Sequence, residues 1–160
     1  MKKDSRRKML FTLFMGASYI FFGLAQLIAG SSNTLLGITG PGSLGKAITE
    51  MLFIPPDAIG GLVLILIGCV FTYGFVEIHS GKEEGIAYVY VGILLSLIFA
   101  GIYVLAAFGN ILEAYLLQNE AFAEWSVLDD IRPEIYLGLI SLLAYLKWKD
   151  SFDIDDTLKP

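Results

Sequence analysis

The stretch LFTLFMGASYIFFGLAQLIAG, residues Leu10–Gly30, decides the fold because it carries no charged side chain along its whole length. A helix needs about 20 mainly apolar residues to cross the hydrocarbon core of a bilayer. Three further segments are also dominated by apolar residues, namely Asp57–Ile78, Ile86–Leu117 and Pro133–Trp148. The sequence therefore predicts an all-α protein, an integral membrane bundle of four helices.

The composition agrees with a single membrane domain over residues 1–160. Of these residues 56% are hydrophobic and 17% are charged, whereas about 25% are charged in a soluble domain. The formal net charge of −5 argues against nucleic acid as a partner, because phosphate binding needs clustered Lys and Arg. Lipid is the partner that the composition predicts.

The third segment is longer than a bilayer requires. Residues 86–117 would form a helix well beyond the core thickness of about 30 Å. We therefore expect it to tilt, to protrude or to break at Gly109-Asn110. Pro133 and Glu134 suit the first turn of the fourth helix, where a missing N–H costs nothing and a negative charge favours the helix dipole.

Lys and Arg in short flanks predict the orientation, because they concentrate on the cytoplasmic side. The flanks on one side contain most of them: Lys2, Lys3, Arg6, Arg7, Lys8, Lys82, Lys147, Lys149 and Lys159. Both termini, including an acidic tail over residues 150–160, are then cytoplasmic, and the protein lies in the cell membrane. Segments Ser31–Pro56 and Gln118–Arg132 face outward, while Tyr145 and Trp148 fit an inner interfacial belt.

An internal repeat is indicated by an alignment of Leu10–Gly30 with Leu94–Ala114. It pairs Thr12 with Ser96, Gly16 with Ala100, Tyr19 with Tyr103, Gly23 with Ala107, and Gln26 with Asn110. Later segments also correspond, with different shifts: Ala47–Met51 with Ala121–Trp125, and Pro56-Asp57 and Gly61-Leu62 with Pro133-Glu134 and Gly138-Leu139. We interpret this as two tandem helical hairpins, residues 9–79 and 86–149, related by a pseudo-two-fold axis along the membrane normal.

Small residues predict how the helices pack. Helices in lipid associate through close backbone approach at Gly, Ala and Ser. Gly16, Gly23 and Gly30 follow one face of the first helix, and Gly92, Ser96 and Ala100 one face of the third. We therefore expect the first and third helices to face each other across the axis.

The paired polar residues are the candidate binding site. Gln26 and Asn110 are repeat-related amides, and Tyr19 and Tyr103 lie about two turns deeper on the same faces. Together they could hold a polar ligand, a hydrated ion or a quinone head group. Alternatively, they bind each other and join the hairpins. Glu113 is a further candidate, because ionisable residues at membrane depth are often functional.

Catalytic and cofactor motifs are not evident in the sequence. Gly40–Ala47 is close to a phosphate-binding loop, but Ala47 stands where that motif needs Ser or Thr. A single histidine, His79, excludes an internal bis-histidine haem and the H-E-x-x-H zinc motif. Without a visible nucleophile and base, we predict a non-enzymatic protein and assign no cofactor.

The first two predicted helices resemble DoxX-like four-helix membrane proteins over less than half of the chain. The resemblance is carried by Arg7, Gly16, Gly23-Leu24-Ala25-Gln26, Ile59-Gly60-Gly61-Leu62 and Gly68. It implies a small subunit of a membrane redox or quinone-linked system. Gln26 departs from the pattern, because a basic residue is expected there.

Three functions fit these observations. The first is a non-enzymatic subunit or assembly partner of a larger membrane complex, packing against other membrane proteins or a second copy. The second is an oligomeric carrier or channel-like module for a cation or small polar solute. The third is a quinone-linked redox subunit.

Overall fold

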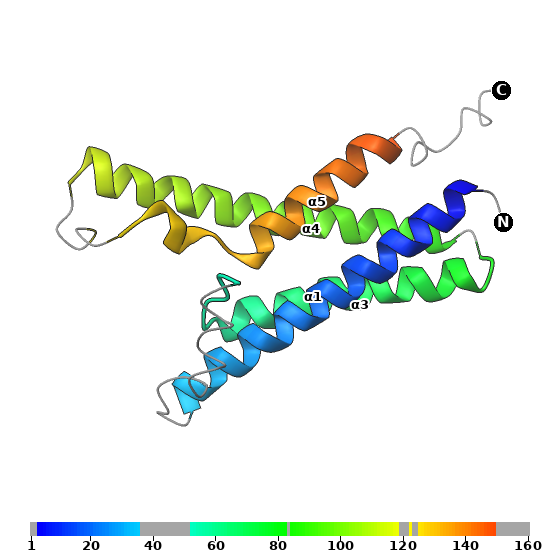
Figure 1. Ribbon diagram of the computed structural model, residues 1–160, viewed down its shortest axis with the longest axis horizontal. Helices are drawn as coiled ribbons and strands as arrows, with labels where there is room; N and C mark the ends of the chain where they lie inside the picture. Colours follow the sequence, from blue (N-terminus) through cyan, green and yellow to red (C-terminus); the bar gives the residue numbers. More distant parts are fainter. Residues whose placement is uncertain (1–2, 36–51, 83, 119–121, 123–124, 150–160) are drawn as a thin grey trace.

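A computed structural model describes residues 3–35, 52–82, 84–118, 122 and 125–149 of the chain, and this part is built from helices (Figure 1). The α-helices are α1 (Lys3–Leu35), α3 (Ala58–His79), α4 (Glu84–Ile111) and α5 (Pro133–Trp148). A π-helical turn, η1 (Leu112–Leu116), follows α4, and a 3₁₀ turn, η3 (Val127–Asp130), precedes α5. The all-α prediction is confirmed. Residues 36–51 and the acidic tail lie outside the described part.

Three of the described helices are long and apolar enough to cross a membrane. These spans are Arg6–Ser31 in α1, Ala58–His79 in α3, and Glu84–Leu116 in α4 with η1. The fourth predicted span coincides with α5, which has 16 residues. At about 1.5 Å per residue, α5 is shorter than a bilayer core of about 30 Å.

The helices form two pairs (Figure 1). α1 lies beside α3, and α4 lies beside α5. The beginning of α1, the turn between α3 and α4, and the end of α5 all lie at one end of the molecule. From that end the two pairs diverge, so that the end of α4 and the end of α1 lie far apart.

Glycines make the first pair close. A Cβ atom at Gly23 would lie 2.8 Å from the carbonyl oxygen of Gly61, and one at Gly61 would lie 2.6 Å from the backbone nitrogen of Leu27. Gly16 lies in the same way against Thr72 and Gly68 of α3. Backbone therefore packs directly on backbone between α1 and α3.

We predicted that the small residues join the first and third predicted spans, which are α1 and α4. This prediction was wrong. The glycines of α1 contact α3, because α3 has its own glycines at matching positions. On α4, Ser96 and Ala100 contact Gly138 of α5, and Gly92 contacts the ring of Phe71. Most of these small residues are thus used inside each hairpin.

Aromatic side chains pack inside the first pair and against the second. Phe71 stacks on Tyr19 at 5.8 Å between ring centroids and meets the edge of Phe11 at 6.0 Å. Phe11 also meets Trp148 at 5.1 Å, and Trp148 is only 7% exposed. Trp148 therefore belongs to the core rather than to the interfacial belt that we predicted for it, because the end of α5 packs toward α1.

The third predicted span is α4, and it continues as a helix through Gly109-Asn110. The break predicted there does not occur. The helix changes character at Leu112, where the backbone N–H of Leu117 donates to the carbonyl of Leu112 at 3.0 Å. Such π-helical turns are uncommon and often lie at functional sites. Glu113 lies in this turn and is partly buried.

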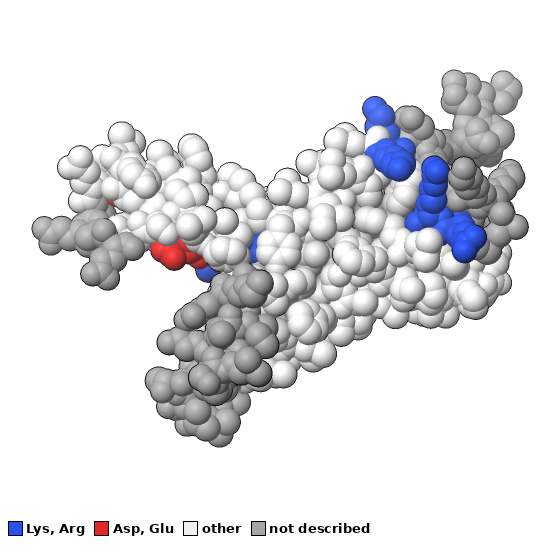
Figure 2. Space-filling view, viewed as in Figure 1, with Lys and Arg blue, Asp and Glu red and all other residues white. Residues whose placement is uncertain are grey.

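Basic side chains gather at the end that carries the start of α1 (Figure 2). The described ones there are Arg6, Arg7, Lys8, Lys82, Lys147 and Lys149. Lys82 forms an ion pair of 2.8 Å with Glu77, closing the turn between α3 and α4. The hydrogen bond to Glu77 raises the pKa of Lys82 above its ordinary value.

Candidate functional site

Polar contacts gather at the opposite end, around the start of α3. Asp57 caps this helix, because its Oδ1 accepts a 2.8 Å hydrogen bond from the N–H of Gly60. Its Oδ2 accepts a 3.3 Å bond from the Tyr103 hydroxyl of α4 and lies 3.6 Å from the guanidinium of Arg132. Arg132 also lies 5.1 Å from the centre of the Tyr103 ring. Asp57, Tyr103 and Arg132 therefore form one charged cluster that joins the two helix pairs.

A second contact joins the pairs beside this cluster. The Nε2 of Gln26 in α1 donates a 3.0 Å hydrogen bond to Oε1 of Glu134 in the first turn of α5. Gln26 is 0% exposed and Glu134 is 1% exposed. Pro133 starts α5 inside the bundle, and this position buries the carboxyl group that follows it. A buried carboxyl group in a membrane protein is a candidate for function.

Tyr19 lies deeper in the interior. It is 1% exposed, and its hydroxyl lies near those of Ser96 in α4 and Ser141 in α5 but, like that of Ser141, has no hydrogen-bond partner within the described chain. The hydroxyl of Ser96 also donates to the carbonyl oxygen of Gly92 at 2.8 Å. Hydroxyl groups from three helices therefore meet within an otherwise apolar core.

Asn110 takes part in a different contact. Its Nδ2 lies 3.0 and 2.9 Å from the two carboxylate oxygens of Asp130, to which it donates. Asp130 belongs to η3, whose start is fixed by a 2.8 Å bond from the N–H of Ser126 to Asp129. Asn110 therefore fastens η3 to the C-terminal part of α4.

The five predicted site residues are not brought together as one pocket. Gln26 binds Glu134, Asn110 binds Asp130, Tyr103 binds Asp57, and Tyr19 lies in the core, so the two amides have separate carboxylate partners. Glu113 lies in η1. Residues of the site that the sequence reasoning did not single out are Glu134, Asp57, Arg132 and Asp130. The available signal was that Asp57 and Glu134 each follow a proline at corresponding positions.

Metal-ligating side chains do not cluster in the described residues, where no three His, Cys, Asp or Glu side chains come together in a suitable group. His79 stacks on Phe75 at 5.9 Å, and Cys69 lies on the exposed face of α3.

Comparison with known proteins decides the family. A family model described as "MJ0565 integral membrane domain" matches residues 7–150. The chain belongs to this family. "Uncharacterized protein MJ0565" of Methanocaldococcus jannaschii is 27% identical over 128 residues, which are 79% of this chain and 83% of that protein. No solved structure matches the chain.

Membership of the MJ0565 integral membrane domain family agrees with the three long apolar helices, and the protein is a membrane protein. The matched region contains all the contacts between the two helix pairs described above. The description of the family names no activity. The resemblance to DoxX-like proteins stays a prediction.

Proposed function

We propose that this MJ0565-family protein is a non-enzymatic subunit or assembly partner of a larger complex in the cytoplasmic membrane. One observation carries the proposal. The end of α4 together with η1, residues Leu105–Leu117, forms an apolar arm that extends beyond α3 and that η3 and Trp125 cover only in part.

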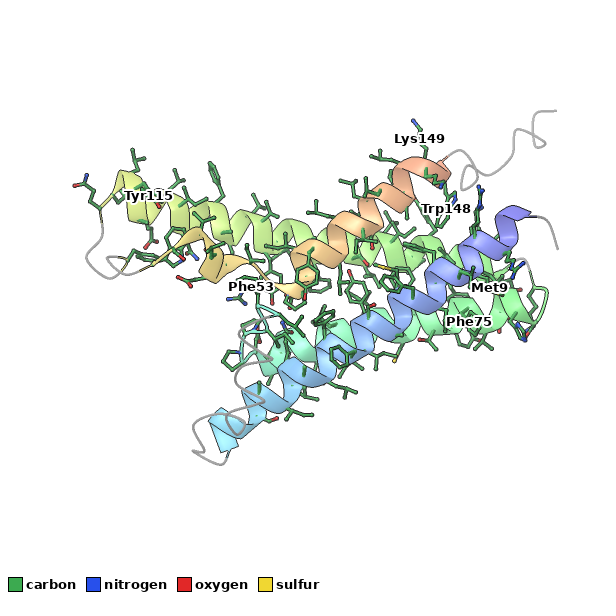
Figure 3. The ribbon with its side chains drawn as sticks, viewed as in Figure 1. Met9, Phe53, Phe75, Tyr115, Trp148 and Lys149 are labelled. Atoms are coloured by element: carbon green, nitrogen blue, oxygen red, sulfur yellow. The ribbon has the colours of Figure 1, made fainter. Side chains whose placement is uncertain are left out.

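The lengths of the helices support this interpretation. α3 has 22 residues and spans about 33 Å, which matches a bilayer core of about 30 Å. The span Glu84–Leu116 has 33 residues and starts from the same turn, so it reaches about 50 Å. About 11 residues of it therefore extend past the start of α3. Tyr115 lies at the far tip of this arm, well beyond Phe53 (Figure 3).

The arm has an apolar surface. The exposed fractions are 72% for Leu105, 66% for Tyr115, 74% for Leu116 and 69% for Leu117. Apolar side chains that extend beyond the hydrocarbon core need another cover, and a partner protein provides one. If water surrounded the arm, we would expect its surface to carry mainly charged or amide side chains.

Photo-cross-linking tests the proposal. A benzoylphenylalanine side chain at Tyr115 should cross-link to a protein in intact membranes, and mass spectrometry would identify either a second copy or another subunit. The matched control is the same probe at Leu143 of α5, which is 68% exposed in the middle of a helix. We expect lipid adducts there. Lipid adducts alone at both positions would contradict the assembly role.

A tandem duplication is part of the proposal, with corresponding positions 77 residues apart. Buried residues recur at this spacing in the first helix of each hairpin: Lys8 and Gly85, Thr12 and Val89, Met15 and Gly92, Gly16 and Ile93, Tyr19 and Ser96, Gly23 and Ala100. They also recur in the second helix: Gly60 and Leu137, Gly61 and Gly138, Leu64 and Ser141, Ile67 and Ala144, Phe71 and Trp148. One spacing therefore fits both helices of the hairpin.

The contacts between the hairpins have the same spacing. Gln26 of the first hairpin donates to Glu134 of the second, and Tyr103 of the second donates to Asp57 of the first. A shift by 77 residues converts one contact into the other. This register differs by seven residues, about two helical turns, from the alignment of Gln26 with Asn110. It supports a pseudo-two-fold arrangement in which α5 also crosses the membrane.

The orientation remains as the basic flanks predict, with both termini in the cytoplasm. Described basic side chains gather at the end that carries the start of α1 and the end of α5. Arg132 is the basic residue described at the other end, where it pairs with Asp57. This asymmetry follows the positive-inside rule.

A second function, a module that conducts a cation or small polar solute, is favoured by the buried polar contacts between the hairpins. Reconstituted vesicles should then take up a labelled monovalent cation faster than empty vesicles, and Glu134→Gln should slow the uptake. Asp129→Asn, at an exposed side chain, is the matched control. Uptake equal to that of empty vesicles would remove this candidate. The quinone-linked alternative stays a prediction.

A further inference from the structure

Glu134 and Gln26 form a half-completed pair. Their one hydrogen bond joins Nε2 of Gln26 to Oε1 of Glu134 at 3.0 Å. The other two oxygen atoms, Oε1 of Gln26 and Oε2 of Glu134, are inaccessible to solvent and have no hydrogen-bond partner within the described chain. One side chain comes from each hairpin, and both are almost fully buried.

The two unpartnered atoms cannot satisfy each other when Glu134 is ionised. A carboxylate accepts hydrogen bonds only, and the amide oxygen of Gln26 is also an acceptor. Each buried acceptor without a partner costs about 1–3 kcal/mol. An ionised carboxyl group away from water costs more unless a cation neutralises it.

The surroundings compensate an ionised Glu134 only in part, through the helix dipole at the start of α5 and through Arg132. Among the described residues, Arg132 is the basic side chain at this end, and Asp57 already accepts its ion pair. The titratable side chains that interact with Glu134 from the neighbouring elements and from its own are Tyr19, Asp57, Tyr103, Arg132 and Tyr136. Arg132 is the one cation in this set, and the carboxylate of Asp57 already balances its charge.

A single proton resolves both problems. A proton on Oε2 turns that atom into a donor, and the planar amide and carboxyl groups are already joined at one side. The buried oxygen of Gln26 is an acceptor without a partner, and a protonated carboxyl group and a primary amide can close a ring with two hydrogen bonds. We propose that Glu134 is a proton-binding site between the two hairpins, held as a neutral acid–amide ring with Gln26. The ligand is one proton per chain, and this site does not depend on the assembly role proposed above.

Two properties separate this site from a simple structural contact. A neutral Glu134 gives a protonated-carboxyl band in the infrared spectrum at neutral pH, whereas an ionised one gives only carboxylate bands. A neutral carboxyl group in apolar surroundings also reacts with dicyclohexylcarbodiimide to give a stable acylurea. An ionised carboxylate, or a glutamine, does not.

The experiment uses the full chain in lipid vesicles at neutral pH. We expect the protonated-carboxyl band in the wild type and its loss in Glu134→Gln. The band should shift in Gln26→Met, because the acid loses its amide partner. Peptide mapping of carbodiimide-treated wild type should find the adduct on Glu134 and not on Asp57, which binds a cation and serves as the internal control.

Two results would overturn the proposal. One is a wild-type spectrum without a protonated-carboxyl band that depends on Glu134. The other is carbodiimide treatment that leaves Glu134 unmodified at neutral pH. The mapping needs only the wild-type chain, so it decides the question even where a variant fails to fold.

Discussion

The close contact between α1 and α3 leads to a quantitative prediction for Gly61→Ala. The new Cβ would lie 2.6 Å from the backbone nitrogen of Leu27 and 2.7 Å from the carbonyl oxygen of Gly23, whereas ordinary contacts begin at 3.4 Å. Both obstacles are backbone atoms. The two helices must therefore separate by about 0.8 Å, and a gap of this size forfeits a quarter to a half of the dispersion energy at the contact.

The matched control is Gly101→Ala, because Gly101 also lies inside a helix and a Cβ there would meet nothing within 4 Å. Both variants gain the same advantage in helix propensity, about 1 kcal/mol. Their difference therefore measures the clash alone. Overpacking of this kind costs about 1–3 kcal/mol, which corresponds to a factor of about 5 to 150 in the unfolding equilibrium.

The assay is denaturant unfolding in mixed micelles, followed by tryptophan fluorescence, to which the buried Trp148 contributes. We expect Gly61→Ala to unfold at a lower denaturant fraction than the wild type, and Gly101→Ala to unfold at the same or a higher one. Equal stability of the two variants, within about 0.5 kcal/mol, would refute the backbone-on-backbone packing of α1 and α3.

Three further predictions concern polar contacts. A double-mutant cycle of Gln26→Leu and Glu134→Leu should give a coupling free energy of about 0.6–1.7 kcal/mol, and a coupling of zero in the same unfolding assay would contradict the contact between hairpins. Asp57→Ala should cost about 1 kcal/mol of stability through the lost helix cap, whereas Asp57→Asn keeps an acceptor for the N–H of Gly60; equal losses would argue against the cap. Because the pKa of Lys82 is raised in the folded state, its ion pair with Glu77 contributes below the ordinary value of 10.5 and is lost as the pH rises through the folded-state value. The difference in melting temperature between wild type and Lys82→Met should therefore vanish at high pH. A difference that stays constant with pH would contradict a stabilising ion pair between Lys82 and Glu77.

Helix positions were predictable because they depend on local properties. Leu10–Gly30 and Asp57–Ile78 are long, mainly apolar segments; the first falls within α1, and the second, after its cap Asp57, falls within α3. Asp57 and Pro133 carry the chemistry of helix starts in their own side chains, and each lies at such a start. These signals need no knowledge of the tertiary structure.

Helix partners were not predictable in the same way. A stripe of small residues indicates that a helix packs closely, but it does not name the helix on the other side. Gly23 fits any small-residue face, and only the fold selects Gly61. The partner of Asn110 depends on the path of the chain before Asp130, which sequence periodicity does not determine.

Glu134 illustrates the limit for the candidate site. In the sequence it is one of several acidic residues near a predicted membrane surface. It becomes a buried group only because α5 begins inside the bundle, against Gln26 of the other hairpin. Burial of a single acid depends on how two distant segments pack, and the proline before Glu134 indicates a helix start but not burial.

Cysteine labelling in intact cells tests most directly whether the chain crosses the membrane as two hairpins that start from the same side. In a Cys69→Ala background, a membrane-impermeant maleimide is applied to chains with a single cysteine at Lys82, Ser126 or Lys149. We predict that Ser126→Cys reacts in intact cells, whereas Lys82→Cys and Lys149→Cys react only after the membrane is opened. Labelling of positions 82 and 126, or 126 and 149, from the same side would contradict the two-hairpin topology.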